Sequence, residues 1–140
     1  MPFGPVTLKH QRLKPYRDPP QTLGDHLKRR RLGLGLFQKD VARQLHVGEW
    51  TYLKWEHDRT FPNIRMWPRV FRFHGFYPFP VPRTLSDRLI AFRRLHGLSR
   101  KELAGQLGVD EGTLAKWENG ERGPARNRME IVEVFLRSYG

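Results

Sequence analysis

Cysteine is absent from this sequence of 140 residues. Neither a disulfide nor a cysteine zinc site can therefore stabilise its fold. Long apolar runs are missing too, since none approaches the roughly 18 residues that a membrane-spanning helix needs. The first five residues, Met1 to Pro5, also lack the apolar core of a secretory signal. We therefore expect a cytoplasmic protein with no membrane partner.

The signatures of common enzyme active sites are also missing. The sequence has no Ser-His-Asp order with supporting motifs, no phosphate-binding loop and no acidic cluster with metal-ligand spacing. The six histidines show no paired metal spacing; they are His10, His26, His46, His57, His74 and His96. We therefore predict neither an enzyme nor a metal or cofactor site.

Acidic residues are scarce, with 14 Asp and Glu against 26 Lys and Arg, so the formal charge is +12. Such a charge predicts an anionic partner, nucleic acid before a membrane surface. Residues 1–80 carry 15 basic against 6 acidic side chains (+9), and residues 81–140 carry 11 against 8 (+3). The first part of the chain is thus expected to bind phosphates more strongly.

The sequence repeats itself at a distance of 62 residues. Residues 45–56 align without a gap on residues 107–118, and residues 22–78 extend the same register onto 84–140 with about 21 identities in 57 positions. Each copy has fewer than 60 residues, near the lower limit for a core without covalent staples. The chain is therefore divided into a basic Pro-rich tail, a first domain, a linker and a second domain, at residues 1–21, 22–77, 78–83 and 84–140.

Helix signals recur in the same order in both copies. Thr22 and Asp25 resemble a capping box, and Ser99 with Glu102 forms a full one. The predicted helices of the first copy run from Leu23 to about Gly35 and over residues 38–45, 49–56 and 67–74. In the second copy Asp110 caps the third helix, and Pro124 precedes a last helix that ends near Arg137.

Proline shapes the tail and the linker. Five prolines in residues 1–21 exclude a stable helix, and two readings stay open: a disordered tail or strap, and a basic arm along phosphates. Alternating prolines in residues 78–83 favour a semi-rigid polyproline II spacer of about 19 Å, whose flanking aromatics offer packing onto the preceding domain.

The repeated unit has the residue types of a helix-turn-helix. Ala42 and Ala104 are small enough to let the third helix cross close to the second, and Val47 and Val109 anchor the turn. The inward face of the third helix carries large residues for a small core, namely Tyr52, Trp55, Leu114 and Trp117. The remaining face of such a helix enters the DNA major groove.

Both copies resemble the lambda repressor/Cro-type family of regulators, also called XRE-type. The resemblance rests on residues 36–42 and 98–104, on Thr-x-x-Lys-Trp-Glu in both copies, and on Asn119-Gly120. It implies an all-α fold of two tandem helix-turn-helix domains, with about four to five helices each, joined by a Pro-rich linker. It also implies sequence-specific binding of double-stranded DNA, and hence a place at the nucleoid.

The resemblance also indicates which residues contact DNA. The candidates in the first copy are Gln38, Lys39, Glu49, Trp50, Thr51 and Lys54, and those in the second are Arg100, Lys101, Glu111, Thr113 and Lys116. Thr contacts bases or thymine methyls, Lys reaches guanine, Glu accepts from cytosine, and Arg100 is placed to bind a phosphate. Acids in a first helical turn also stabilise the helix dipole, an alternative role for Glu49 and Glu111.

The copies differ where specificity is expected. Phe37 and Gly48 replace the capping residues Ser99 and Asp110, so the first copy is expected to be less well capped. Trp50 stands opposite Gly112 in the alignment, and Gly112 offers no side chain for base discrimination. Trp50 either wedges against sugar or thymine, or is buried against the neighbouring domain.

Two hypotheses for function follow. In the first, the chain is a transcriptional regulator, activator or repressor, that reads DNA with two non-identical heads. In the second, one head binds DNA while the other serves a homodimer or docks a protein partner, as in an antitoxin or a mobile-element accessory factor.

Overall fold

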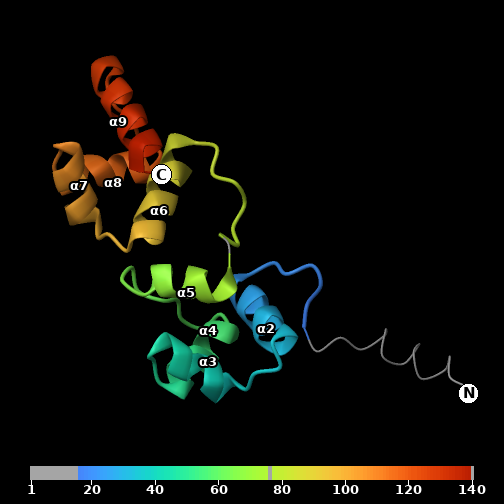
Figure 1. Cartoon of the computed structure of the whole chain (residues 1–140). Coiled ribbons are helices and arrows are strands. Elements are labelled where there is room, and N and C mark those ends of the chain that lie inside the picture. The colour runs from blue at the N-terminus through green and yellow to red at the C-terminus, as the bar shows by residue number, and fades with distance from the viewer. Residues whose placement is uncertain (1–15, 76, 140) are drawn as a thin grey trace, which may run out of the picture. The chain divides into compact units, whose positions relative to one another are not determined.

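The computed structural model describes residues 16–75 and 77–139. In this part of the chain all regular structure is helical (Figure 1), which confirms the predicted all-α class. The eight helices are α2 (Leu23–Gly33), α3 (Gln38–Leu45), α4 (Glu49–Glu56), α5 (Trp67–His74), α6 (Leu85–His96), α7 (Arg100–Leu107), α8 (Glu111–Asn119) and α9 (Arg126–Tyr139). The described residues contain no helix that is both long and apolar enough to span a membrane.

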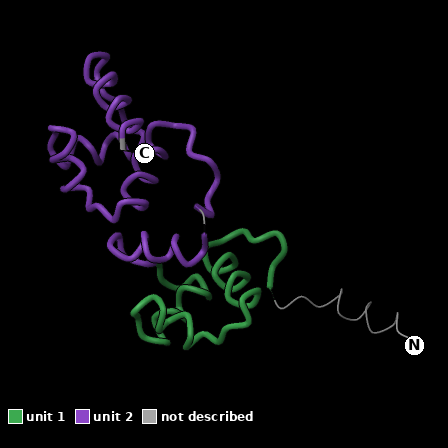
Figure 2. Tube along the Cα trace, in the orientation of Figure 1, with its two compact units in different colours: residues 1–61 green, residues 62–140 purple. Residues whose placement is uncertain are grey.

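The helices form two compact units (Figure 2). Unit 1 comprises residues 1–61 and unit 2 residues 62–140. This contact-based boundary lies inside the predicted first domain, residues 22–77, and groups α5 with the helices that follow it. Within unit 2, α5 packs against α6.

Unit 1 is built on α4, which packs against both α2 and α3. Its buried apolar side chains come from all three helices: Leu23, Leu27, Val41, Ala42, Leu45, Tyr52 and Trp55. The predicted capping box of α2 is present, since the Thr22 hydroxyl accepts from the Asp25 N–H (3.1 Å) and the Asp25 carboxylate accepts from the Thr22 N–H (3.2 Å). The Asp58 carboxylate adds bonds from the Thr22 hydroxyl (2.6 Å) and the Gly24 N–H (2.9 Å).

The other two helices of unit 1 begin without a side-chain cap. Phe37 and Gly48 occupy the N-cap positions of α3 and α4, and neither offers a side-chain acceptor. The Phe37 N–H donates to the Asp40 carboxylate at 2.8 Å, so only half of a capping box exists there. In unit 2, Ser99 and Asp110 accept from the N–H groups of Glu102 and Thr113. The predicted difference in capping between the copies is thus confirmed.

Unit 2 has a core in which α6, α7, α8 and α9 meet. The core consists of nine buried residues: Leu89, Phe92, Leu103, Ala104, Leu107, Leu114, Trp117, Val132 and Leu136. Leu85, Leu98, Val109 and Phe135 pack around this core. Val109 therefore anchors the turn between α7 and α8 as predicted.

Aromatic side chains of residues 77–79 pack against α5. The Tyr77 ring lies 5.2 Å from that of Phe71, and the Phe79 ring lies 5.7 Å from that of Trp67, between centroids. The guanidinium carbon of Arg94, from α6, lies 5.0 Å from the Trp67 centroid and 4.8 Å from the Phe79 centroid. Residues of the proline-rich segment thus pack onto the helix before it.

The predicted charge asymmetry depends on where the chain is divided. Residues 1–61 hold 12 Lys and Arg against 6 Asp and Glu, and residues 62–140 hold 14 against 8. Each unit therefore carries +6. The charges of residues 65, 69 and 72, which the sequence division gave to the first copy, belong to unit 2.

Candidate nucleic-acid interface

A buried ion pair joins the first and third helices of unit 1. The Arg31 guanidinium donates to both Glu56 carboxylate oxygens, from Nε at 2.6 Å and from Nη2 at 3.1 Å. Its third nitrogen, Nη1, donates to the Leu36 carbonyl oxygen at 3.1 Å. The side chains of Arg31 and Glu56 are only 10% and 2% exposed. Because Arg31 joins α2 to Glu56 of α4 and to Leu36 in the α2–α3 connection, the pair fixes the angle at which α4 is held.

Unit 2 contains the same arrangement 62 positions later. The Arg93 guanidinium donates to Glu118 at 2.7 Å from Nε and at 2.9 Å from Nη2, and its Nη1 donates to the Leu98 carbonyl oxygen at 3.3 Å. The Glu118 side chain is 2% exposed, as in Glu56. The two copies therefore share a polar scaffold as well as apolar core positions.

Charge and burial shift the pKa values around the first pair. Burial alone raises the pKa of Glu56, but hydrogen bonds, first from Arg31, outweigh burial and hold the pKa below its usual value. The pKa of Arg31 is raised, mainly by its hydrogen bonds to Glu56. The buried Tyr52 hydroxyl beside the pair has a raised pKa, first because of burial and then because of Glu56. All three groups hold their ordinary charge at neutral pH, so the pair persists there.

A third side chain completes each cluster from the start of the next helix. Gln38 Nε2 donates to Glu56 Oε1 at 3.2 Å, and Arg100 Nε donates to Glu118 Oε1 at the same distance. Gln38 and Arg100 were predicted to contact DNA, and the structure gives each an intramolecular partner as well. Arg100 remains 38% exposed in its side chain, so part of its guanidinium still faces outward.

The arginine–glutamate pairs themselves were not among the predicted site residues. Arg31 ends a run of four basic residues, Lys28 to Arg31, and Glu56 ends the Thr-x-x-Lys-Trp-Glu motif. The sequence does contain the relevant signal, because Arg and Glu occur 25 residues apart at corresponding positions in both copies. An arginine and a glutamate that recur at the same spacing in both repeats could have indicated the pair.

The predicted base-reading residues of unit 1 lie on α4 away from its core face. Tyr52, Trp55 and Glu56 point inward and are buried. Trp50 and Lys54 are one turn apart, directly opposite that buried face at 100° per residue, with Thr51 to one side. Trp50 is 64% exposed. Glu49 is exposed in the first turn, where a carboxylate also stabilises the helix dipole.

The corresponding face of α8 in unit 2 carries Gly112, Thr113 and Lys116, with Glu111 exposed in its first turn. The Thr113 N–H bond to the N-cap carboxylate of Asp110 (2.7 Å) lowers the pKa of that carboxyl. A β-carbon at Gly112 would lie 3.3 Å from Asp110 Oδ1, which is tighter than ordinary contact. A side chain at position 112 would therefore require the Asp110 side chain to shift slightly, whereas Gly48 has no side chain that could crowd Trp50.

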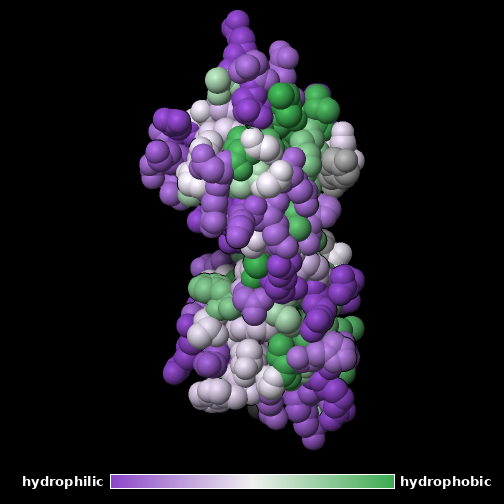
Figure 3. Space-filling model, turned by 90° about the vertical axis from the view of Figure 1, so that its left-hand side faces the viewer, coloured by the Kyte–Doolittle hydropathy of each residue, from purple (hydrophilic) through white to green (hydrophobic). Residues whose placement is uncertain are grey.

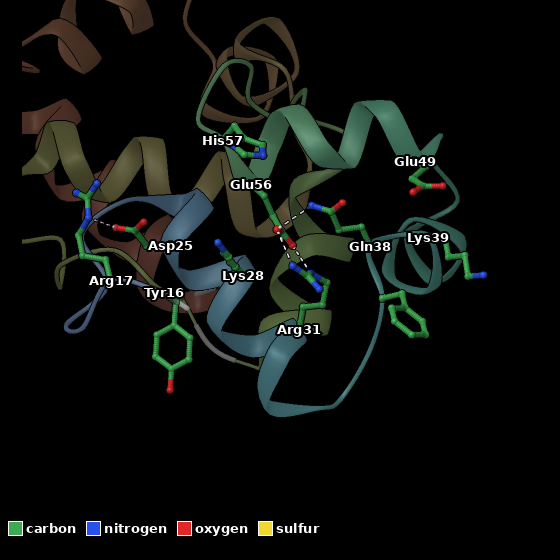
Figure 4. A pocket seen from close by; sticks show the side chains of 11 residues that line it. Tyr16, Arg17, Asp25, Lys28, Arg31, Gln38, Lys39, Glu49, Glu56 and His57 are labelled. Carbon is green, nitrogen blue, oxygen red and sulfur yellow. Dashed lines mark hydrogen bonds and ion pairs between the residues drawn. The ribbon is translucent and has the colours of Figure 1, made fainter. Parts of the chain in front are cut away.

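The N-termini of α3 and α4 border an open groove in unit 1 (Figure 4). Arg31, Gln38 and Glu56 lie at its centre, and Lys39 and Glu49 lie at one side. The groove has a volume of about 700 Å³. Three predicted site residues, Gln38, Lys39 and Glu49, therefore meet at one surface. In unit 2, Arg100 and the exposed Lys101 occupy the first turn of α7.

The described end of the N-terminal tail is held at the start of α2. The Arg17 side chain donates to Gln21 (3.1 Å) and pairs with Asp25 (3.4 Å), and Arg29 pairs with Asp18 (3.0 Å). Arg29 also lies 5.6 Å from the Tyr16 ring centroid. Residues 1–15 of the predicted tail, residues 1–21, lie outside the described residues, so the strap and the basic arm both stay predictions.

Comparison with known families identifies one of the two copies. Residues 89–138 match the family model described as Helix-turn-helix (HTH_3), so this segment is a helix-turn-helix domain of the XRE type. Such a domain implies DNA binding. The match covers most of α6 and all of α7 and α8, and it ends within α9. No curated protein and no solved structure matches the chain significantly. The family resemblance is therefore confirmed for the second copy, and for the first copy it stays a prediction.

Proposed function

We propose that this protein is a non-enzymatic transcriptional regulator that binds double-stranded DNA in a sequence-specific way with two tandem helix-turn-helix heads. The observation that carries the proposal is the recurrence of one polar scaffold. Arg31 and Glu56 in unit 1 repeat the contacts of Arg93 and Glu118, which lie within the helix-turn-helix domain at residues 89–138. A scaffold that aims α8 of that domain is expected to aim α4 in the same way.

The proposed base-contacting surface of each head is the first turn and the outward face of its third helix. For the first head it comprises Glu49, Trp50, Thr51 and Lys54, with Gln38 and Lys39 from α3. For the second head it comprises Glu111, Thr113 and Lys116, with Arg100 and Lys101 from α7. Major-groove reading by such a helix uses its N-terminal residues, and cations beside it bind phosphates. Residues 22–77 carry 11 Lys and Arg against 5 Asp and Glu (+6), and residues 84–140 carry 10 against 8 (+2), so both heads are basic and the first head more strongly.

The predicted domain boundaries belong to this proposal. In the repeat register α5 corresponds to α9, and the central valines of the two helices, Val70 and Val132, are both fully buried. This correspondence supports a first head that extends to residue 77. The second head then begins at residue 84, after a proline-rich linker over residues 78–83.

Selection of bound sites from random duplex DNA by the full-length chain tests the proposal. We expect an asymmetric site with two half-sites, because α4 and α8 present different side chains. The double variant Thr51→Ala/Lys54→Ala should erase one half-site from the selected sequence, and Thr113→Ala/Lys116→Ala the other. Arg122→Ala, at an exposed position after α8, is the matched control and should change the salt dependence but not the site.

A footprint of one half-site that is insensitive to the α4 variants would contradict two-headed reading. That outcome would favour a second candidate function, in which one head alone binds DNA; if that head is the helix-turn-helix domain at residues 89–138, its α9 could also join two chains in a homodimer. Ile131 and Val134 favour this candidate, since they are three residues apart on α9 and 54% and 55% exposed. Analytical ultracentrifugation of the wild type and of Ile131→Glu/Val134→Glu distinguishes the two, because only a dimer through α9 would dissociate.

A further inference from the structure

Three aromatic side chains in the described part of unit 1 are exposed, Phe37, Trp50 and Phe61, and the first two lie at the start of α3 and on α4. Phe37 is 69% exposed and Trp50 is 64% exposed, and the corresponding residues in unit 2 are Ser99 and Gly112. On the face drawn in Figure 3 most side chains are hydrophilic and apolar ones form small separate patches. Large aromatics at such exposure bury little of their apolar surface within the unit.

Neither aromatic is explained by the folding of unit 1. Phe37 occupies an N-cap position where a serine would supply the missing acceptor, as Ser99 does in unit 2. Trp50 lies two residues after Gly48, the N-cap residue of α4, which forms no side-chain hydrogen bond. In α8 the Asp110 side chain caps the helix and lies close to where a β-carbon at Gly112 would be. Phe37 thus stands where unit 2 has the capping residue Ser99. Trp50 stands where unit 2 has Gly112, which leaves room for the Asp110 side chain.

The surroundings of the two aromatics indicate what covers them. The Lys39 ammonium lies 5.7 Å from the Phe37 ring centroid, and Lys54 lies one helical turn after Trp50. The buried carboxylate of Glu56 is paired with Arg31, and the two acids near the aromatics are Glu49, in the first turn of α4, and Asp40, which accepts from the Phe37 N–H. An aromatic surface flanked by lysines is complementary to a ligand with apolar groups and a polyanionic backbone. Duplex DNA has both.

The apolar feature that the DNA major groove offers is the 5-methyl group of thymine. Trp50 lies on the side of α4 opposite its core face. It would therefore face the bases if α4 entered the major groove. Phe37 lines the groove at the N-termini of α3 and α4 together with Lys39 and Glu49, and Glu49 directly precedes Trp50 on α4.

We propose that unit 1 recognises thymine through its 5-methyl group, with Trp50 as the main contact and Phe37 beside it, and that unit 2 lacks this readout. The inference rests on the proposed DNA binding and specifies what the first head reads. The half-site of unit 1 is then rich in thymine at the positions that Trp50 covers. The half-site of unit 2 is read by polar contacts from Thr113 and Lys116.

Replacement of thymidine by deoxyuridine tests the methyl contact directly, because uracil lacks the methyl group of thymine and keeps every hydrogen-bonding group. The probe is the duplex selected by the full-length wild-type chain, with single thymines replaced one at a time. We expect about a fourfold loss of affinity for each replacement at one or two positions of the first half-site, as for removal of one buried apolar carbon. Trp50→Ala should bind the thymine and uracil duplexes equally, and Trp50→Phe should keep part of the difference.

Intrinsic fluorescence gives a second readout. Of the four tryptophans, Trp55, Trp67 and Trp117 are 3%, 6% and 5% exposed, so Trp50 is the exposed one. Its emission should shift to the blue and resist iodide quenching when the selected duplex is added. Circular dichroism checks that Trp50→Ala is folded, as expected for an exposed position.

The outcomes separate this inference from the proposed function. Uracil duplexes that bind as tightly as thymine duplexes, or a uracil effect that persists in Trp50→Ala, would overturn the methyl readout while DNA binding by two heads still stood. A Trp50 emission unchanged by bound DNA would also overturn the methyl readout, because Trp50 would then lie outside the DNA interface. Failure to select any duplex would reject the proposed function and this inference together.

Discussion

The bidentate contact between Arg31 and Glu56 links α2 to α4 through a side-chain pair that is almost entirely buried. A buried charge is stable only when it is paired and hydrogen-bonded, and both conditions are met here. The same contact between Arg93 and Glu118 links α6 to α8. Duplication has thus preserved the geometry of the polar core together with the apolar one.

Removal of one partner of this pair should destabilise unit 1 strongly. Glu56→Ala leaves Arg31 buried without a counter-charge, and we expect a loss of about 3–5 kcal/mol. Arg31→Met/Glu56→Leu should restore most of the loss, because an apolar pair carries no desolvation cost. Urea unfolding with hydrogen exchange on α2 and α4 measures both. Arg17→Ala, which breaks an exposed pair with Asp25, is the control at less than about 1 kcal/mol, and an equally small effect for Glu56→Ala would contradict the argument.

The N-cap of α3 predicts a conflict between stability and binding. Phe37→Ser should stabilise unit 1 by about 1 kcal/mol, since it supplies the acceptor that α3 lacks. The same change should weaken DNA binding if Phe37 belongs to the contact surface. Ser99→Ala is the matched change in unit 2 and should cost about 1 kcal/mol. Thermal unfolding and DNA titration of both variants test the two effects separately.

Gly24 is required by the close approach of α2 to the end of α4. A β-carbon there would overlap the Glu56 carbonyl oxygen and lie 2.8 Å from both Asp58 carboxylate oxygens. Gly24→Ala should therefore cost about 1–3 kcal/mol through overpacking. Gly105→Ala, in α7 with nothing within 4 Å of the new methyl group, should stabilise by about 0.5–1 kcal/mol. Urea midpoints that move in the same direction would refute the steric explanation.

The capping box of α7 predicts a dependence on acid. The Ser99 N–H hydrogen bond, assisted by Arg65, lowers the pKa of Glu102 from 4.5 to about 2. Because the pKa is lower in the folded state, the stabilisation is complete above about pH 4.5 and is lost as the pH falls towards 2. Glu102→Gln keeps the cap geometry without titrating, so its melting temperature should fall less over this range. Glu130→Gln, on the exposed surface of α9, should follow the wild type.

Arg94 should hold the proline-rich segment in place. Its guanidinium lies over both Trp67 and Phe79, and cation–π contacts of this kind contribute about 0.5–2 kcal/mol. Arg94→Ala should make residues 77–83 more sensitive to limited proteolysis, and Arg94→Lys should keep part of the protection. Arg83→Ala, at an exposed position in the same segment, should have little effect. Equal cleavage of wild type and Arg94→Ala would show that the aromatic contacts suffice.

Much of the fold could be predicted from the sequence. The bounds of α3, α4 and α5 agree with the expected helices because Pro68, the turn at Gly48 and the spacing of apolar residues are local signals. The buried Trp55 and Trp117 were expected from their positions on an amphipathic helix. The candidate site was predicted less completely, since Gln38 and Arg100 turned out to bond to buried glutamates.

The sequence by itself determined the two copies, their helices, their caps and the apolar positions that fill each core, because these depend on local patterns and on a repeat that can be aligned. Tertiary structure decided which charges are buried, since Arg31 meets Glu56 only when α2 and α4 pack together. It also decided that Arg94 of α6 lies on the rings of Trp67 and Phe79. Contacts between residues far apart in the chain depend on how the helices pack, and no local pattern contains that information.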